Sequence, residues 1–214
     1  MGKYVFSAAD CFYDRLCADY ILRSNPAAAF SKGALRVSSY SIEGLGYASL
    51  IRVQKSFGRL TEAAVFAPLY KDAPVFMADR VKTLFSDSLS VNILDAGLKK
   101  MYYRQFQNVS DDYNGMPDAD CSSGWYQDIL ISGSVCKNIK GRADAAQMLE
   151  DYLGAYIKIM EFAEKCCSSE KGKKLCEIRD GFLEKGSESA DFAKKVLSEA
   201  GAAELFEKIL FPAE

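Results

Sequence analysis

The middle of the chain carries the strongest constraint on the fold. Between Gly33 and Asp95, short runs of β-branched and aromatic residues alternate with glycine and proline, without long helical periodicity. These runs predict five strands, at residues 34–42, 47–54, 60–67, 75–83 and 89–94. Their connections span only about two to eight residues, whereas a parallel crossover needs a dozen or more. The sequence therefore predicts a contiguous antiparallel sheet.

Helical periodicity dominates on both sides of this segment. Helices are predicted at residues 8–22, after residue 95, at 143–165, at about 174–184, and at 189–210 with a break at Gly201. Residues 125–139 fit neither pattern. The 214 residues show no repeat or linker, so we expect one domain, residues 1–214. Its predicted class is α+β, a three-layer α/β/α sandwich with a central antiparallel sheet.

The composition narrows the possible chemistry. The chain has no His, which excludes Ser-His-Asp and Cys-His nucleophiles, His-ligated zinc and His-ligated haem. Proton transfer must therefore use Asp, Glu, Lys, Tyr or Cys. The 27 basic and 29 acidic residues give a formal charge of -2, so no overall positive field favours nucleic acid or an anionic membrane. No apolar run approaches the roughly 18 residues needed to span a bilayer.

The seven cysteines are odd in number and irregularly spaced, and they lack the CxxC pairs of zinc and iron-sulfur sites. The opening residues, MGKYVFSAADCFYDR, show neither a basic nor an apolar signal region. We therefore expect reduced thiols, a cytoplasmic location and no metal site.

Three separated segments carry further information. They are VFAPLYKDAPVFMADRV at residues 65–81, the Ser-containing segment and Tyr-Leu-x-x-Tyr helix at 128–163, and the Asp-bearing run at 189–211. Taken in order, they resemble the ferredoxin-dependent bilin reductases, which reduce open-chain tetrapyrroles such as biliverdin. Met77 departs from the resemblance, because the family usually has Gly there. The resemblance implies a biliverdin-like substrate, electrons from ferredoxin and no bound cofactor.

The resemblance and the strand pattern together indicate three proton donors. Asp79 matches the family's Asp and, by alternation, shares a strand face with Val75 and Met77. Glu62, seventeen positions earlier, falls where some members have His, and we expect it opposite or diagonal to Asp79 on the neighbouring strand. Two carboxylates at that range would leave one protonated. Asp191 matches the family's helical Asp and would approach from the other side of the pocket. The sequence pattern of each of these three residues is also that of an ordinary surface acid without a catalytic role.

Substrate binding is assigned to cations and aromatic rings. A bilin carries two propionates, for which Arg52 and Lys137 are the favoured partners. Phe66 and Phe76 would supply a flat apolar wall, although aromatics at strand spacing are more often core. Candidate contacts for an acidic ferredoxin are Lys99, Lys100, Arg104, Lys137, Lys140 and Arg142.

Four interpretations remain open. The chain fits a ferredoxin-dependent reductase of a biliverdin-like bilin, a chlorophyll-catabolite reductase, or a non-catalytic tetrapyrrole carrier of the same fold. It also fits an unrelated α+β interaction protein. We expect no nucleic-acid partner and no membrane partner.

Overall fold

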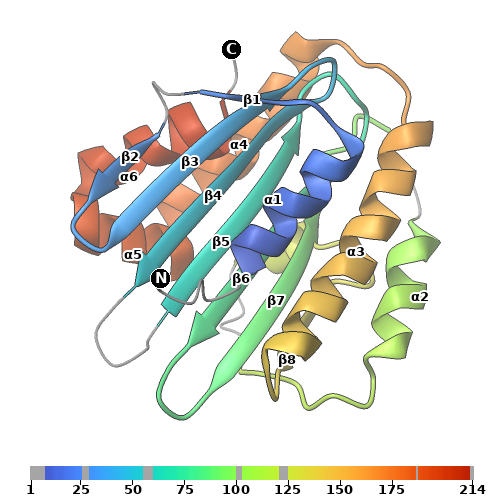
Figure 1. Cartoon of the computed structure of the whole chain (residues 1–214). Helices are drawn as coiled ribbons and strands as arrows, with labels where there is room; N and C mark the ends of the chain where they lie inside the picture. The colour runs from blue at the N-terminus through green and yellow to red at the C-terminus, as the bar shows by residue number, and fades with distance from the viewer. Residues whose placement is uncertain are drawn as a thin grey trace.

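The computed structural model describes residues 8–25, 29–54, 60–99, 103–120, 125–186 and 188–212. Its middle layer is an eight-stranded antiparallel sheet in the order β1-β3-β4-β5-β6-β7-β8, with β2 paired to β3 (Figure 1). The strands are β1 (Leu22–Ser24), β2 (Phe30–Lys32), β3 (Leu35–Ile42), β4 (Gly46–Gln54), β5 (Leu60–Pro68), β6 (Val75–Lys82), β7 (Asp87–Leu94) and β8 (Val135–Asn138). The five predicted strands are confirmed as β3 to β7, with ends that differ by no more than two residues.

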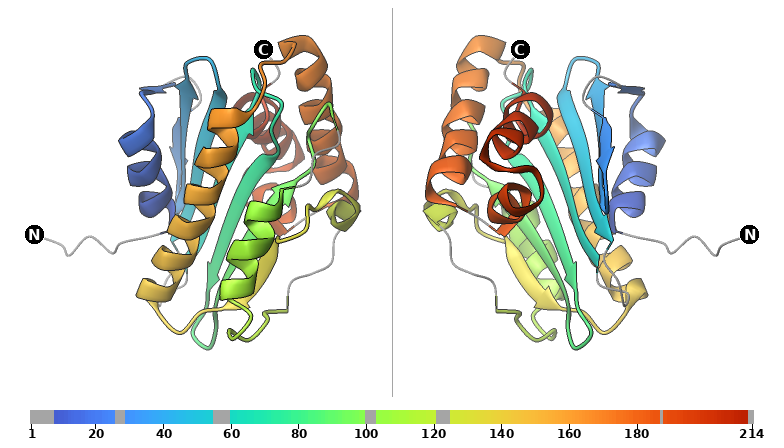
Figure 2. Two further views of the ribbon diagram at one scale, coloured as in Figure 1. Left: turned by 90° about the vertical axis from the view of Figure 1, so that its right-hand side faces the viewer. Right: turned by 90° about the vertical axis from the view of Figure 1, so that its left-hand side faces the viewer.

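Helices form the two outer layers (Figure 2). They are α1 (Ala8–Asp19), α2 (Arg104–Asp112), α3 (Arg142–Phe162), α4 (Ser168–Lys185), α5 (Glu188–Leu197), α6 (Glu199–Leu205), the 3-10 helix η3 (Trp125–Ile129) and the π-helix η4 (Phe206–Leu210). We call the side covered by α1, α2 and α3 the front face, and the side covered by η3 and the C-terminal helices the back face. The predicted α+β sandwich with a central antiparallel sheet is confirmed.

Two helix boundaries near the sheet differ from those predicted. The first helix ends at Asp19, because Leu22 leaves it and pairs with Ile42 as part of the edge strand β1. The helix expected directly after residue 95 begins only at Arg104. Residues 125–139, which fitted neither the strand nor the helix pattern, form η3 and the sheet's last strand, β8.

The C-terminal helix breaks at Ser198 rather than at the predicted Gly201. Ser198 has a φ of 82°, a conformation that non-glycine residues rarely adopt. Its side-chain oxygen accepts a hydrogen bond from the Gly201 backbone N–H and so caps α6. The break is therefore set by a cap, not by the glycine.

Strand alternation gives each face of the sheet its own core. On β5, Phe66 belongs to the front core and Val65 to the back core. Tyr156 of α3 lies fully buried at the centre of the front core, and its hydroxyl donates a hydrogen bond to the Pro74 carbonyl at 2.8 Å.

The short helix η3 is fixed to α4 through Trp125. A Cβ atom on Gly181 would lie 2.3 Å from the indole ring, so only glycine allows this approach. The indole N–H donates to the Gly186 carbonyl at 3.2 Å, and the ring lies edge-on to Phe182. This contact holds η3 against the back of the molecule.

A fully buried lysine connects α4 to two loops. The Lys171 ammonium donates hydrogen bonds to the carbonyls of Ala73 and Ala96, which precede β6 and follow β7. Burial lowers the pKa of Lys171 to about 8, although the charges of Asp72, Cys166 and Asp95 act in the opposite direction. A neutral amine keeps two N–H donors, enough for both carbonyls, so the contact survives deprotonation.

The cysteines differ in part from the prediction of reduced thiols. Five described cysteines are free, but Cys136 on β8 is disulfide-bonded. The expectation is therefore wrong for Cys136, because disulfide formation depends on spatial proximity that the spacing of the cysteines did not indicate.

We expect the stability of the protein to rise between pH 8 and pH 9.5 in a way that depends on Lys171. In this window the folded state has released the proton that the unfolded lysine, with its ordinary pKa of 10.5, still holds. The free energy of unfolding should therefore gain about 1 kcal/mol per pH unit relative to Lys171→Met. Urea unfolding of both proteins at the two pH values measures the difference. Parallel pH profiles would contradict the assignment.

Candidate functional site

The register of β5 on β6 separates the two carboxylates that the sequence predicted to be neighbours. Glu62 lies opposite Arg80, whereas Asp79 lies opposite Ala63. Because directly opposed residues share a face, Glu62 points to the front face and Asp79 to the back. The predicted Glu62–Asp79 pair is therefore wrong: the register differs by one residue from the one that would join them.

Glu62 has structural partners on the front face. Its side chain is 1% exposed and accepts hydrogen bonds from the Ala8 N–H and from Arg52 Nε, both at 3.0 Å. Ala8 is the first residue of α1, so the carboxylate stabilises the positive end of that helix. Arg52 also donates to Asp10 Oδ1 at 2.8 Å. Both predicted site residues thus anchor α1 to the sheet.

The two phenylalanines expected to line the pocket belong to the front core. Phe66 and Phe76 are fully buried, with ring centroids 5.4 and 5.3 Å from that of Tyr156. They lie on the side opposite to Asp79 and cannot form a wall of the same pocket. The core interpretation of these aromatics is the correct one.

Lys137 is buried rather than presented to a ligand. It is 6% exposed, and its ammonium donates to Asp118 Oδ1 at 2.6 Å and to the Met116 carbonyl at 3.4 Å. It ties the loop after α2 to β8, so its predicted roles toward a propionate and toward ferredoxin are wrong.

The other predicted ferredoxin contacts differ in their ion pairing and in whether the structure describes them. Lys99 pairs with Glu164, while Lys140 and Arg104 are exposed. Lys100 and the side chain of Arg142 lie outside the described residues. Within the described residues, Lys99, Arg104 and Lys140 are therefore the exposed cations of the predicted set.

Asp79 is the one predicted site residue whose described side chain lies on the back face. It is half-buried and lies opposite Ser90 on β7, two residues from the Met77–Asn92 pair. We call Asp79, Ser90 and Asn92 the back-face polar patch. Asp191 belongs to α5, which also covers this face, but its side chain is outside the described residues.

The back-face polar patch is unusual for the centre of a covered sheet. At one end of the same strand pair, Val75 and Leu94 are fully buried beneath the C-terminal helices. The three patch residues, in contrast, are only half-buried. Solvent therefore reaches this half of the back face, whereas on the front side of β6 Phe76 is fully buried and Arg80 is 4% exposed.

The patch offers specific chemistry. It combines a carboxyl group, a hydroxyl and an amide, bordered by the apolar side chains of Ala63 and Met77. The Ser90 hydroxyl donates to Cys136 Sγ at 3.3 Å, which fixes its direction. A carboxyl group beside apolar side chains and two further polar groups can bind a polar ligand and exchange a proton with it.

No three His, Cys, Asp or Glu side chains among the described residues are placed to hold a metal ion. No helix in the described part of the chain has the length and apolarity to cross a membrane.

Comparison with known proteins gives a structural match without a sequence match. No family model matches the sequence, and no curated protein gives a significant match. The fold is similar to that of phytochromobilin synthase from tomato, solved in complex with biliverdin, with a TM-score of 0.72. The match covers 95% of this chain and 80% of the tomato chain, at 13% sequence identity. At this identity, the chain shares the fold of that protein.

Replacing Glu62 should destabilise the protein by detaching α1. We expect Glu62→Ala to lower the free energy of unfolding by about 2 kcal/mol, because it removes an acceptor from a buried helix N-terminus and one of the two carboxylates that pair with Arg52. Urea unfolding followed by circular dichroism measures the loss. The matched control is Glu43→Ala, which removes an exposed ion pair with Arg23 and should leave stability nearly unchanged. Equal losses in both variants would contradict the anchoring role.

Proposed function

We propose that this protein binds a linear tetrapyrrole of the biliverdin type on the back face and reduces it with electrons from ferredoxin. The observation that carries the proposal is the half-exposed polar patch on the covered back face of a fold shared with a biliverdin-bound protein. The three sequence segments that resemble the bilin reductases support it independently.

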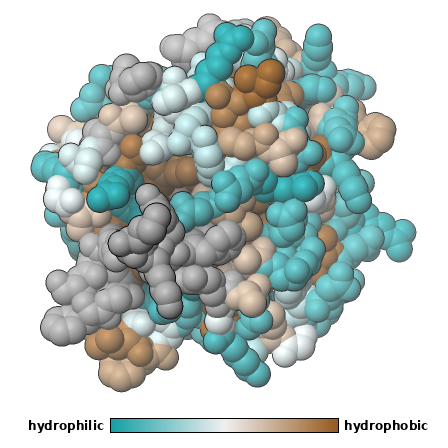
Figure 3. Space-filling model, in the orientation of Figure 1, coloured by the Kyte–Doolittle hydropathy of each residue, from teal (hydrophilic) through white to brown (hydrophobic). Residues whose placement is uncertain are grey.

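The front face is less suited to a pigment. Its central side chains are fully packed, and its buried acids and cations pair with each other. Apart from the grey atoms, the surface in Figure 3 is mainly hydrophilic with small separate apolar patches. A flat, largely apolar tetrapyrrole needs an open apolar surface with a few polar groups, which favours the back face.

In the proposed mechanism, Asp79 donates a proton to the reduced pigment. Ser90 and Asn92 orient polar groups of the ligand beside it, and Met77 contacts its apolar surface. Asp191 assists from the helical side. Ferredoxin is the proposed electron donor because the three sequence segments resemble the ferredoxin-dependent bilin reductases. Chlorophyll-catabolite reduction and non-catalytic pigment carriage are the alternatives.

The first test is visible absorbance on mixing with biliverdin, before and after reduced ferredoxin is added. A spectral shift on mixing, followed by loss of the biliverdin band and a new product band, is the expected result. A shift without turnover would favour the carrier. No shift would contradict the proposal.

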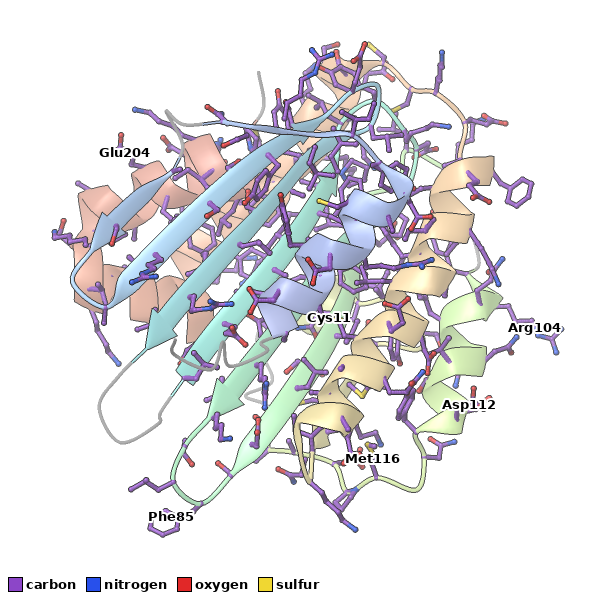
Figure 4. All side chains as sticks on the ribbon, viewed as in Figure 1. Cys11, Phe85, Arg104, Asp112, Met116 and Glu204 are labelled. Carbon is purple, nitrogen blue, oxygen red and sulfur yellow. The ribbon has the colours of Figure 1, made fainter. Side chains whose placement is uncertain are left out.

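The second test examines Asp79 directly. Asp79→Asn should bind biliverdin with nearly wild-type affinity, because apolar contacts persist, but turn over at least tenfold more slowly. A one-electron-reduced pigment radical should accumulate and be visible by electron paramagnetic resonance. The control is Asp112→Asn, an exposed acid on α2 of the front layer (Figure 4), which should retain wild-type rates. Wild-type turnover in Asp79→Asn would reject Asp79 as the donor.

A further inference from the structure

A cavity lies away from the back-face polar patch, where β2 meets the C-terminal helices. Its volume is about 350 Å³. Its walls come from β2, the end of α5, α6 and η4, none of which contributes to the patch. The volume falls at the lower end of the range of about 300–1,000 Å³ that is typical of small-molecule sites.

The floor of this cavity is apolar. Leu205 is 1% exposed and Ile209 3%, and both belong to the back core, with Leu197 packed beside them. Gly201 also lines the cavity, and a Cβ atom there would lie 2.8 Å from Leu197 Cβ. The absence of a side chain at this position leaves the space above Leu197 open.

The rim of the cavity carries an excess of positive charge. Lys208 donates to Glu204 Oε1 at 2.9 Å, and both side chains are exposed. Glu204 projects outward from α6 in Figure 4. Lys32, at the end of β2, is exposed and has no ion-pair partner in the described part of the chain. Two ammonium groups and one carboxylate therefore border an apolar floor.

Two backbone irregularities adjoin the same cavity. Ser198, with its positive φ, separates Leu197 from α6, and the π-helical turn η4 places Lys208 and Ile209. A uniform α-helix from α5 to the C-terminus would distribute these side chains differently around its axis. The cavity thus depends on the two deviations from regular helix.

We propose that this cavity binds a small anionic amphiphile, a single-chain monocarboxylate of about the size of octanoate. The alkyl chain contacts Leu197, Leu205 and Ile209, and the carboxylate lies between Lys32 and Lys208. The cationic rim selects the anionic head, and the apolar floor selects the chain. The inference is independent of the tetrapyrrole proposal, because the two sites share no residue.

Three exposed charge variants of the full chain test the assignment by calorimetric titration with sodium octanoate below its micelle concentration. Lys32→Gln should weaken binding about three- to tenfold. Glu204→Gln should strengthen it about threefold, because it releases Lys208 from its ion pair. The matched control, Lys195→Gln on α5, removes the same charge from a residue that does not line the cavity and should leave the affinity unchanged.

Two further measurements identify the location and the chemistry. In amide NMR spectra, octanoate should shift the signals of Gly201 and Lys32, while 1-octanol should bind with an affinity that none of the three variants changes. A Kd for octanoate above about 10 mM, equal effects of Lys32→Gln and Lys195→Gln, or a weaker affinity in Glu204→Gln would overturn the proposal.

Discussion

The register between β5 and β6 determines what each face of the sheet can do. It places Asp79 beside Ala63 on the back face and Glu62 beside Arg80 on the front. Since side chains alternate with a period of two, a shift of one residue would exchange the entire set between faces. The apolar environment of Asp79 and the ion pairs of Glu62 therefore both depend on the same ladder of backbone hydrogen bonds.

The polar groups of the two faces differ in burial and in ion pairing. On the front face, buried charges are neutralised locally: Arg52 pairs with Glu62 and Asp10, and Arg80 pairs with Asp87. Such pairs fix α1 and the β6–β7 hairpin in one arrangement. On the back face, the polar patch remains half-buried between the core and solvent. A polar group that is neither fully packed nor fully solvated is suited to exchange its contacts for those of a ligand.

The sequence was a good guide to local structure and a poor one to the site. The strands were predicted within two residues because alternation and short connections are local properties. Spacing along the chain did not determine how β5 and β6 align, since residues 69–74 join them by a loop rather than a tight turn. Glu62 and Lys137 could not be identified as structural, because Ala8 and Asp118, their partners, are 54 and 19 positions away. Ser90 and Asn92 were missed because only pairing with β6 brings them beside Asp79.

The contact of Trp125 with Gly181 gives the protein an internal optical reporter. The chain contains a single tryptophan, so its intrinsic indole fluorescence comes from one position, where η3 meets α4 on the back side of the molecule. The Lys185 ammonium lies 5.3 Å from the ring centroid, and the emission of an indole is sensitive to a nearby charge and to solvent. A displacement of α4 from η3 would change both the distance from the indole to the Lys185 charge and the exposure of the indole to solvent. The emission maximum therefore reports the position of this helix in the unmodified protein, without an attached dye.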